Sequence, residues 1–374
     1  MAGKRFILGF ILSLALVVFS WPGAQIAQAS CGSVTCFVVI GSAQQVSPKG
    51  LLTVNTFYNY TPQGTLLSDT NGVIPAVDLD NRQLILGHHQ EIRTISQMYT
   101  LDLNYGVTDR FGIEVAIPYK RIKHQHIDGL GEDIDGNGGV GVPTRFSDNG
   151  IGDIFINAKY NLLPTLSSMV VTSFGVYLPT GDHKQKTAGV EGAETMEPTA
   201  QIGRGQVGFQ GSIYQTYEII PHRLNQFASA SYRHTFRNNF GYQFGDQFDF
   251  GLGATLVTVP WLVLTNQFNY RYMVHDSFSG SLAQSLTPSD PGFPNGATVI
   301  DPNITNRGVP TTGSSFFAYT PGFHIGLGEL VKTSLTENTS LYFYSQIPIA
   351  RDFNGNLAQG VSYVFGLTKL FQVM

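Results

Sequence analysis

Three residues about a third of the way along the chain have the spacing of a partial calcium-binding loop. Asp133, Asp135 and Asn137 occupy alternating positions in a glycine-rich stretch. Alternating side-chain oxygens of this kind can wrap one Ca²⁺, but a complete loop has an acidic twelfth residue, and that position is Thr144 here. An acidic, glycine-rich surface loop explains the run equally well. We therefore treat the three residues as a partial match and predict no metal centre.

Several histidines are candidates for a hydrolytic or a metal-binding site. His275-Asp276-Ser277 contains the residue types of a hydrolytic site, but the sequence shows no further part of such a motif. A catalytic triad is recognised by geometry and not by spacing alone. The pairs His88-His89 and His124/His126 have no third ligand at a fixed spacing, which favours surface residues over a metal site. We expect no enzyme activity.

The two cysteines lie close together near the N-terminus. Cys31 and Cys36 follow a candidate export signal, and an oxidising compartment favours a small disulfide loop between them. A c-type haem would need the spacing Cys-x-x-Cys-His, which neither cysteine has, and zinc would need more ligands. We predict a disulfide and no cofactor.

The elements that must position side chains are strands, because apolar and polar residues alternate along most of the chain. From Val361 to Val373 the odd positions carry mainly apolar side chains and the even positions mainly polar ones. A period of two indicates a strand with one apolar face. We predict twelve such strands, at residues 50–60, 91–107, 111–123, 150–163, 169–178, 206–219, 226–237, 247–259, 261–275, 315–327, 339–349 and 359–373.

The connections between these strands alternate in length. Val107–Arg110 and Val259-Pro260 are tight turns, whereas residues 61–90, 124–149 and 276–314 are long and rich in Gly, Pro, Asn and Asp. Short turns on one side, long loops on the other and an even strand count are typical of outer-membrane barrels. The sequence therefore predicts an all-β, antiparallel up-and-down transmembrane barrel over residues 50–374, with both termini in the periplasm.

Parity assigns the faces of each strand. Where odd residues such as Ile113, Val115 and Ile117 face lipid, the even Glu114 must face the interior. A Lys or Arg facing lipid at mid-depth would cost about 2–4 kcal/mol. The charged residues predicted to face the interior are Asp102, Glu114, Asp153, Lys159, Glu218, Arg233, Asp249 and Arg271. Because buried charges are normally paired, they could line a pore or form a salt-bridged network that fills the barrel.

The N-terminal sequence predicts export. Residues 1–29 contain the basic pair Lys4-Arg5, an apolar stretch from Phe6 to Phe19 and small residues before a cleavage site after Ala29. The whole chain has 22 basic and 26 acidic residues, and loss of Lys4 and Arg5 with the leader leaves 20 and 26, a net charge of −6 that does not suggest nucleic acid. Residues 30–49 would form a short periplasmic segment that either plugs the barrel or hangs free.

Two stretches carry a family resemblance. One is Gly150-Ile-Gly-Asp153 with the strand that follows it, and the other is Pro179-Thr-Gly-Asp182 followed by Gly203-Arg-Gly205. They resemble the outer-membrane β-barrels grouped as transporters of the MetA pathway of phenol degradation. The resemblance implies an outer-membrane channel for small, often hydrophobic compounds. The C-terminus departs from many outer-membrane barrels, because it ends in Met374 and not in Phe.

These observations predict a monomeric bacterial outer-membrane channel that admits small, hydrophobic or aromatic molecules by passive diffusion. Its partners would be outer-membrane lipid, the barrel assembly machinery and an unidentified small-molecule substrate. One alternative is a structural or adhesive barrel with a plugged lumen. A third is an outer-membrane phospholipase-like barrel enzyme, although parity turns His275 inward and a lipid-cleaving site would face outward.

Overall fold

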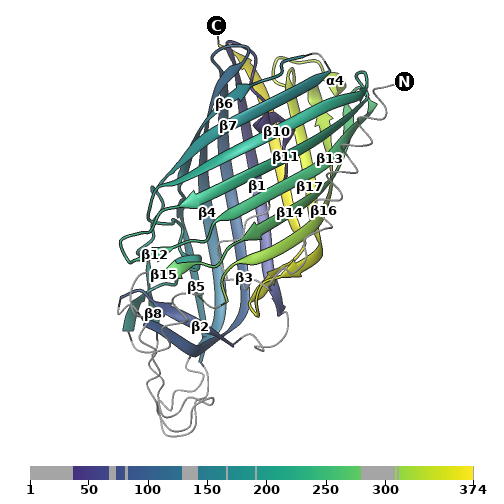
Figure 1. The fold of residues 1–374 in the computed structure, drawn as a ribbon. Coiled ribbons are helices and arrows are strands. Elements are labelled where there is room, and N and C mark those ends of the chain that lie inside the picture. Colours follow the sequence, from purple (N-terminus) through teal and green to yellow (C-terminus); the bar gives the residue numbers. More distant parts are fainter. Residues whose placement is uncertain are drawn as a thin grey trace, which may run out of the picture.

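Twelve long antiparallel strands form a closed barrel (Figure 1). The computed structural model describes residues 37–66, 73–80, 83–128, 142–165, 167–189, 192–278, 308–309 and 311–373. The barrel strands are β1 (Leu51–Leu66), β3 (Gln83–Gly106), β4 (Phe111–Asp128), β6 (Ile154–Asn161), β7 (Ser168–Leu178), β10 (Gly208–Ile220), β11 (Leu224–Thr235), β13 (Gln247–Val259), β14 (Leu262–Met273), β16 (Ser314–Gly326), β17 (Thr339–Asp352) and β19 (Ser362–Gln372). Each barrel strand pairs with the next along the chain, and β1 pairs with both β3 and β19, which closes the barrel. The predicted all-β, twelve-stranded barrel is confirmed.

The two ends of the barrel differ. At the turn end, the upper end in Figure 1, β19 ends beside the start of β1 and successive strands join through short connections. At the opposite end, here called the loop end, several strands continue beyond the barrel and pair with β2 (Val73–Asp78), β5 (Val142–Ile151) and β18 (Leu357–Gln359). The prediction that residues 61–90 and 124–149 are entirely loop is therefore wrong. Pro143 and Gly150 obscure β5 in the sequence, but an edge strand tolerates both residue types.

The strands alternate between a polar inner face and an apolar outer face. On β6, Asn157 and Lys159 are buried while Ile156 and Tyr160 are each more than 40% exposed. On β14, Gln267 and Asn269 are buried between exposed neighbours such as Phe268. This arrangement is the reverse of a water-soluble protein, and it is the one expected of a barrel surrounded by lipid.

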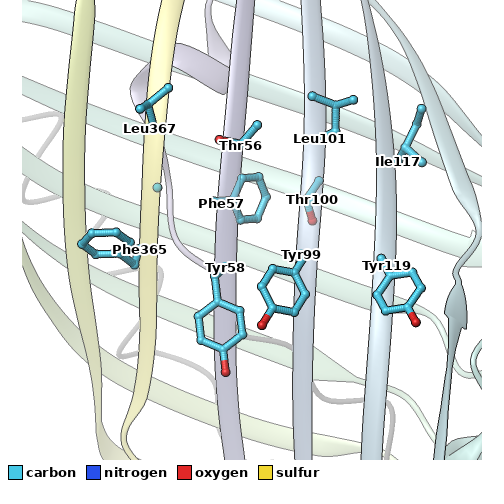
Figure 2. Close-up of a pocket in the computed structure, with 11 residues that line it drawn as sticks. Thr56, Phe57, Tyr58, Tyr99, Thr100, Leu101, Ile117, Tyr119, Phe365 and Leu367 are labelled. Atoms are coloured by element: carbon cyan, nitrogen blue, oxygen red, sulfur yellow. The ribbon is translucent and has the colours of Figure 1, made fainter.

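Aromatic side chains form a row on the outer face. Tyr58, Tyr99 and Tyr119 lie on the neighbouring strands β1, β3 and β4, in register with one another, and Phe365 on β19 continues the row (Figure 2). The hydroxyl groups of the three tyrosines point the same way, away from Leu101 and Ile117 (Figure 2). The row borders a shallow groove of about 520 Å³. Rings with an apolar body and a polar tip are characteristic of a membrane–water interface.

The remaining elements are short and lie mainly at the loop end. They are β8 (Lys186–Gly189), β9 (Gly192–Thr195), the 3₁₀ helix η1 (Pro198–Ala200), β12 (Tyr242–Gln243) and β15 (Ser277–Phe278), together with α2 (Gly41–Gln44) and, at the turn end, α4 (Leu327–Leu330). Val77, Leu79, Tyr242, Phe244, Phe278 and Val309 form an apolar cluster that joins the loop-end elements. Within the described ranges, no helix has the length and apolar character needed to cross a membrane.

Candidate functional site: the barrel interior

The N-terminal segment, residues 37–49, runs through the barrel. The Gln267 side chain of β14 accepts a hydrogen bond from Val39 N at 2.9 Å and donates one to Val39 O at 3.3 Å. Gln346 Nε2 on β17 donates to Phe37 O at 2.8 Å, and Asn104 Nδ2 on β3 donates to Gln45 O at 2.8 Å. The part of the predicted periplasmic segment that the structure describes therefore lies inside the barrel and not below it.

Apolar contacts hold the same segment against one side of the barrel. Ile40 is buried with Tyr342, Tyr344 and Val364, which come from β17 and β19. Phe37 packs edge-on against Phe316 of β16, with ring centroids 5.9 Å apart. Side chains on β1, β14, β16, β17 and β19 that face inward are consequently buried almost throughout.

The sequence-predicted charged residues fall into separate groups inside the barrel. Glu114 and Lys159 form an ion pair at 2.9 Å, and Asn157 Nδ2 donates to the same Glu114 oxygen at 2.8 Å. Asp102 is buried on the neighbouring strand β3, and Asn55 Nδ2 on β1 donates a hydrogen bond to it at 3.5 Å. Lys159 also donates to the backbone oxygen of Ala43, so this group binds the N-terminal segment.

A second ion pair lies across β13 and β14. Arg271 Nε donates to Asp249 at 2.6 Å, and the guanidinium carbon of Arg271 lies 4.0 Å from the centre of the Phe37 ring. Glu218 is separate from both groups. It lies at the turn end, where it accepts a hydrogen bond from the backbone of His222. These contacts are those of a network that fills the barrel on the side of the N-terminal segment.

The wall formed by β7, β10 and β11 is different. Four of its inward-facing residues, Ser173, Ser212, Ser229 and Ser231, are small, polar and only half-buried, whereas Val171, Tyr214 and Phe227 on the same face are buried. Ser173 and Ser212 contact each other through their hydroxyl groups at 2.7 Å. Because these side chains face away from lipid, their exposed surface borders the interior of the barrel. Space inside the barrel therefore remains beside these serines.

The residues of the family resemblance form hydrogen bonds around the break between β5 and β6, residues 152–153. Thr180 Oγ1 donates to Gly152 O at 2.7 Å and accepts from Ile154 N at 3.0 Å. Asp153, predicted to face the interior, accepts hydrogen bonds from Gly181 N at 3.1 Å and Arg204 N at 3.0 Å. A Cβ on Gly203 would lie 2.2 Å from Gly181 O, so only glycine permits this close approach.

Arg233, the last of the predicted residues, belongs to a group that sequence reasoning missed. Its guanidinium lies over the Tyr177 ring at 3.6 Å, near Lys120 and Arg204. Lys120 is an even residue on the same face of β4 as Glu114, so the alternation that assigned Glu114 to the interior also predicts an inward-facing Lys120. Arg204 lies in a loop, where no periodic signal applies.

Of the remaining motifs, some of the histidines lie among the described residues, whereas the cysteines and the partial calcium-binding loop lie outside them. The prediction that His124 is a surface residue is wrong, because it is buried beside Glu91 and His126, with nitrogen–oxygen and nitrogen–nitrogen distances of 3.4 and 2.8 Å. Ser277 Oγ accepts a hydrogen bond from Arg237 at 3.0 Å, and His275 Nδ1 lies 3.3 Å from Val309 O. No group of three or more potential metal-ligating side chains occurs among the residues that the structure describes. Cys31, Cys36, Asp133, Asp135 and Asn137 lie outside those residues, as does the predicted leader.

Comparisons with known proteins place this barrel in a family. The family model described as "Putative MetA-pathway of phenol degradation" matches residues 97–288, just over half of the chain. The COG4313 outer membrane channel from Pseudomonas putida F1 is similar in structure, with a TM-score of 0.57 and 11% identity over 90% of this chain and 100% of that one. The toluene transporter TbuX of Ralstonia pickettii gives a TM-score of 0.41 and 10% identity over 87% of this chain and 90% of that one. No curated protein matches. The similarity to the COG4313 channel, at 11% identity, shows a shared fold and not a shared activity. The family match supplies the identification: the chain belongs to the MetA-pathway phenol-degradation family of β-barrels.

Proposed function

We propose that the protein is a channel of the bacterial outer membrane through which small molecules, including hydrophobic and aromatic ones, cross by passive diffusion. The observation that carries this proposal is the half-buried serine wall of β7, β10 and β11, which borders space beside the N-terminal segment. Hydroxyl groups offer weak contacts that a diffusing molecule can make and leave. Membership of a family named for phenol degradation supports aromatic compounds as the substrate class.

The proposal also covers the surroundings of the barrel. The exposed apolar outer face and its tyrosine row support insertion among outer-membrane lipids. The predicted leader, cleaved after Ala29, would deliver the chain to the barrel assembly machinery. No catalytic step is included in the proposed function.

A matched pair of bulky substitutions on β11 tests the proposal. Ser231 faces the interior and Ala230 faces outward on the same strand. Ser231→Trp should obstruct the remaining space, whereas Ala230→Trp adds similar bulk on the lipid side. We expect the first to lower both single-channel conductance in a planar bilayer and uptake of labelled toluene by intact cells. The second should leave both unchanged. Equal conductance and uptake for both variants and the wild type would contradict the proposed path.

A plugged structural barrel is the second candidate, because the N-terminal segment fills one side of the interior. Under that hypothesis the wild-type protein should conduct no ions, and Ser231→Trp should change only its stability. A measurable wild-type conductance that Ser231→Trp reduces would decide in favour of the channel.

A further inference from the structure

Three cationic side chains converge at the loop end of the serine wall. Lys120 comes from β4, Arg233 from β11 and Arg204 from the loop between η1 and β10. Lys120 Nζ donates to Ile202 O at 2.9 Å, and Arg204 Nη1 donates to Thr235 Oγ1 at 2.9 Å. Arg204 also lies 4.8 Å from the centre of the Phe244 ring. Each of these contacts uses only part of the hydrogen-bonding capacity of its cation.

These cations differ from the others inside the barrel. Lys159 and Arg271 each have a carboxylate partner, at 2.9 and 2.6 Å. Among the described residues, no carboxylate oxygen lies within 4 Å of a charged nitrogen of Lys120, Arg204 or Arg233. A charge that is shielded from water and has no partner is costly, so three neighbouring cations without a carboxylate call for an explanation.

Arg233 is the least satisfied of the three. Its Nε is buried and finds no hydrogen-bond acceptor in the described part of the chain, and its guanidinium lies over the Tyr177 ring at 3.6 Å. The side chain as a whole is half-buried. A guanidinium has five donors in a planar fork that matches the two oxygens of a carboxylate. Its donors are therefore available to a ligand in the remaining space.

The nearest acidic residues are already engaged. Asp153 accepts from the backbone N–H groups of Gly181 and Arg204, and Asp276 accepts from Gly245 N at 2.7 Å and from the Tyr242 hydroxyl. Burial and then the charge of Arg233 lower the pKa of Arg204, while Asp276 and Asp153 raise it. The cations thus lie close enough to repel one another, and the nearby acids reduce that repulsion without occupying the donors of Arg233.

Aromatic rings complete the cluster. Phe155 on β6 and Tyr177 on β7 are opposite one another in the sheet and stack at 4.4 Å, with 27° between their planes. Tyr177 donates from its hydroxyl to Gln210 at 2.8 Å, which fixes the ring beneath Arg233. A flat apolar surface beside unpaired guanidinium donors fits a ligand that has both a ring and an anionic group.

We propose that Lys120, Arg204 and Arg233, with the Phe155–Tyr177 ring pair, bind the carboxylate of a small aromatic acid inside the barrel. The guanidinium of Arg233 donates to the carboxylate oxygens, and Lys120 and Arg204 supply the remaining positive charge. As a substrate assignment, this inference rests on the proposed channel function. The inferred site would bind aromatic acids in preference to neutral compounds on the path along the serine wall.

Titration calorimetry on the full-length barrel in detergent tests the binding, with sodium benzoate, benzyl alcohol and sodium phosphate as probes. Benzoate should bind at least about tenfold more tightly than neutral benzyl alcohol, because hydrogen bonds to charged groups contribute that much. Arg233→Gln should weaken benzoate binding by about ten- to a hundredfold, and Arg233→Lys by less, since it keeps the charge but not the fork. Lys123→Gln, on the outer face of β4, is the matched control and should have no effect.

Thermal unfolding of the same variants separates ligand binding from a structural role. Arg233→Gln removes a cation without a carboxylate partner, so it should leave the melting temperature of the ligand-free barrel unchanged or higher. Equal affinity for benzoate and benzyl alcohol, phosphate binding as tight as benzoate binding, or unchanged benzoate affinity in Arg233→Gln would each overturn the proposal. If benzoate binds as expected but Ser231→Trp leaves conductance and uptake intact, the anion site stands and the channel proposal fails.

Discussion

At the scale of single residues, the interior of the barrel is organised by buried charges and their partners. Glu114 and Lys159 are both buried and joined at 2.9 Å, and the same lysine binds the backbone of Ala43. Removing one member of a buried pair leaves the other without compensation, whereas removing both can be nearly neutral. The stability of the barrel should therefore depend on the pair as a unit.

Glu114→Gln should lower the free energy of unfolding by about 3–5 kcal/mol, because it leaves Lys159 buried without a carboxylate. Adding Lys159→Met to that variant should recover most of the loss. Urea unfolding of the barrel in lipid vesicles measures both values. Glu218→Gln is the control, because Glu218 lies at the turn end beside the exposed His222 and such a pair contributes at most about 1 kcal/mol. Equal losses for Glu114→Gln and the double variant would contradict the pairing.

Asp276 should give the loop end a dependence on pH. Burial raises the pKa of Asp276 above its ordinary value of 3.8, although hydrogen bonds from Tyr242 and Gly245 oppose the shift. The folded protein therefore binds more protons than the unfolded chain between 3.8 and the raised pKa. Stability should fall as the pH rises through that window and level off above it. Asp276→Asn, which keeps the shape, should remove this contribution.

The measurement is the melting temperature of the wild type and of Asp276→Asn at a series of pH values. The difference between them should change in favour of the asparagine variant as the pH rises from 3.8 through the raised pKa. A constant difference across this range would show that Asp276 titrates normally in the folded protein.

At the scale of elements, the N-terminal segment acts as an internal support for one side of the barrel. Its backbone accepts or donates hydrogen bonds with side chains of β3, β6, β14 and β17. On β7, β10 and β11, Tyr214 lies close to Gly41 of the segment, whereas Ser173, Ser212, Ser229 and Ser231 retain partial exposure. One element thus both stabilises the barrel and narrows its interior.

Replacing residues 37–45 by a Gly-Ser sequence of equal length should raise single-channel conductance, because the contacts of Phe37, Val39 and Ile40 are lost. The same change should lower the melting temperature, since a flexible chain without its apolar anchors no longer holds its backbone groups against Gln267, Gln346 and Lys159. Planar-bilayer recording and thermal unfolding provide the two measurements. A lower melting temperature without any change in conductance would mean that the segment does not limit the path.

At the scale of the whole molecule, the barrel has a turn end and a loop end, and insertion into a membrane places each end on a different side of the bilayer. The first barrel strand begins and the last one ends at the turn end, the upper end in Figure 1. Strands β3 and β4 extend beyond the barrel at the loop end, where an apolar cluster joins the loops. This asymmetry is consistent with insertion in one direction, loop end outward.

Cysteines introduced singly into a Cys31→Ser, Cys36→Ser background test that direction. Lys184 and Asn239 are exposed at the loop end, and cysteines there should react with a membrane-impermeant maleimide on intact cells. Thr108 and Lys332 are exposed at the turn end and should react only after the outer membrane is opened. The reverse pattern would contradict the predicted orientation.

The alternation of residues by itself determined the twelve strands and the faces of their side chains. Lipid on one side and a polar interior on the other constrain every second residue, so Ile156 and Lys159 could be assigned without coordinates. The pairing of Glu114 with Lys159, the path of residues 37–49 and the meeting of Lys120, Arg204 and Arg233 depended on the tertiary structure. These contacts join strands and loops far apart in the sequence. Their geometry follows from the closure and stagger of the whole barrel, which no local pattern encodes.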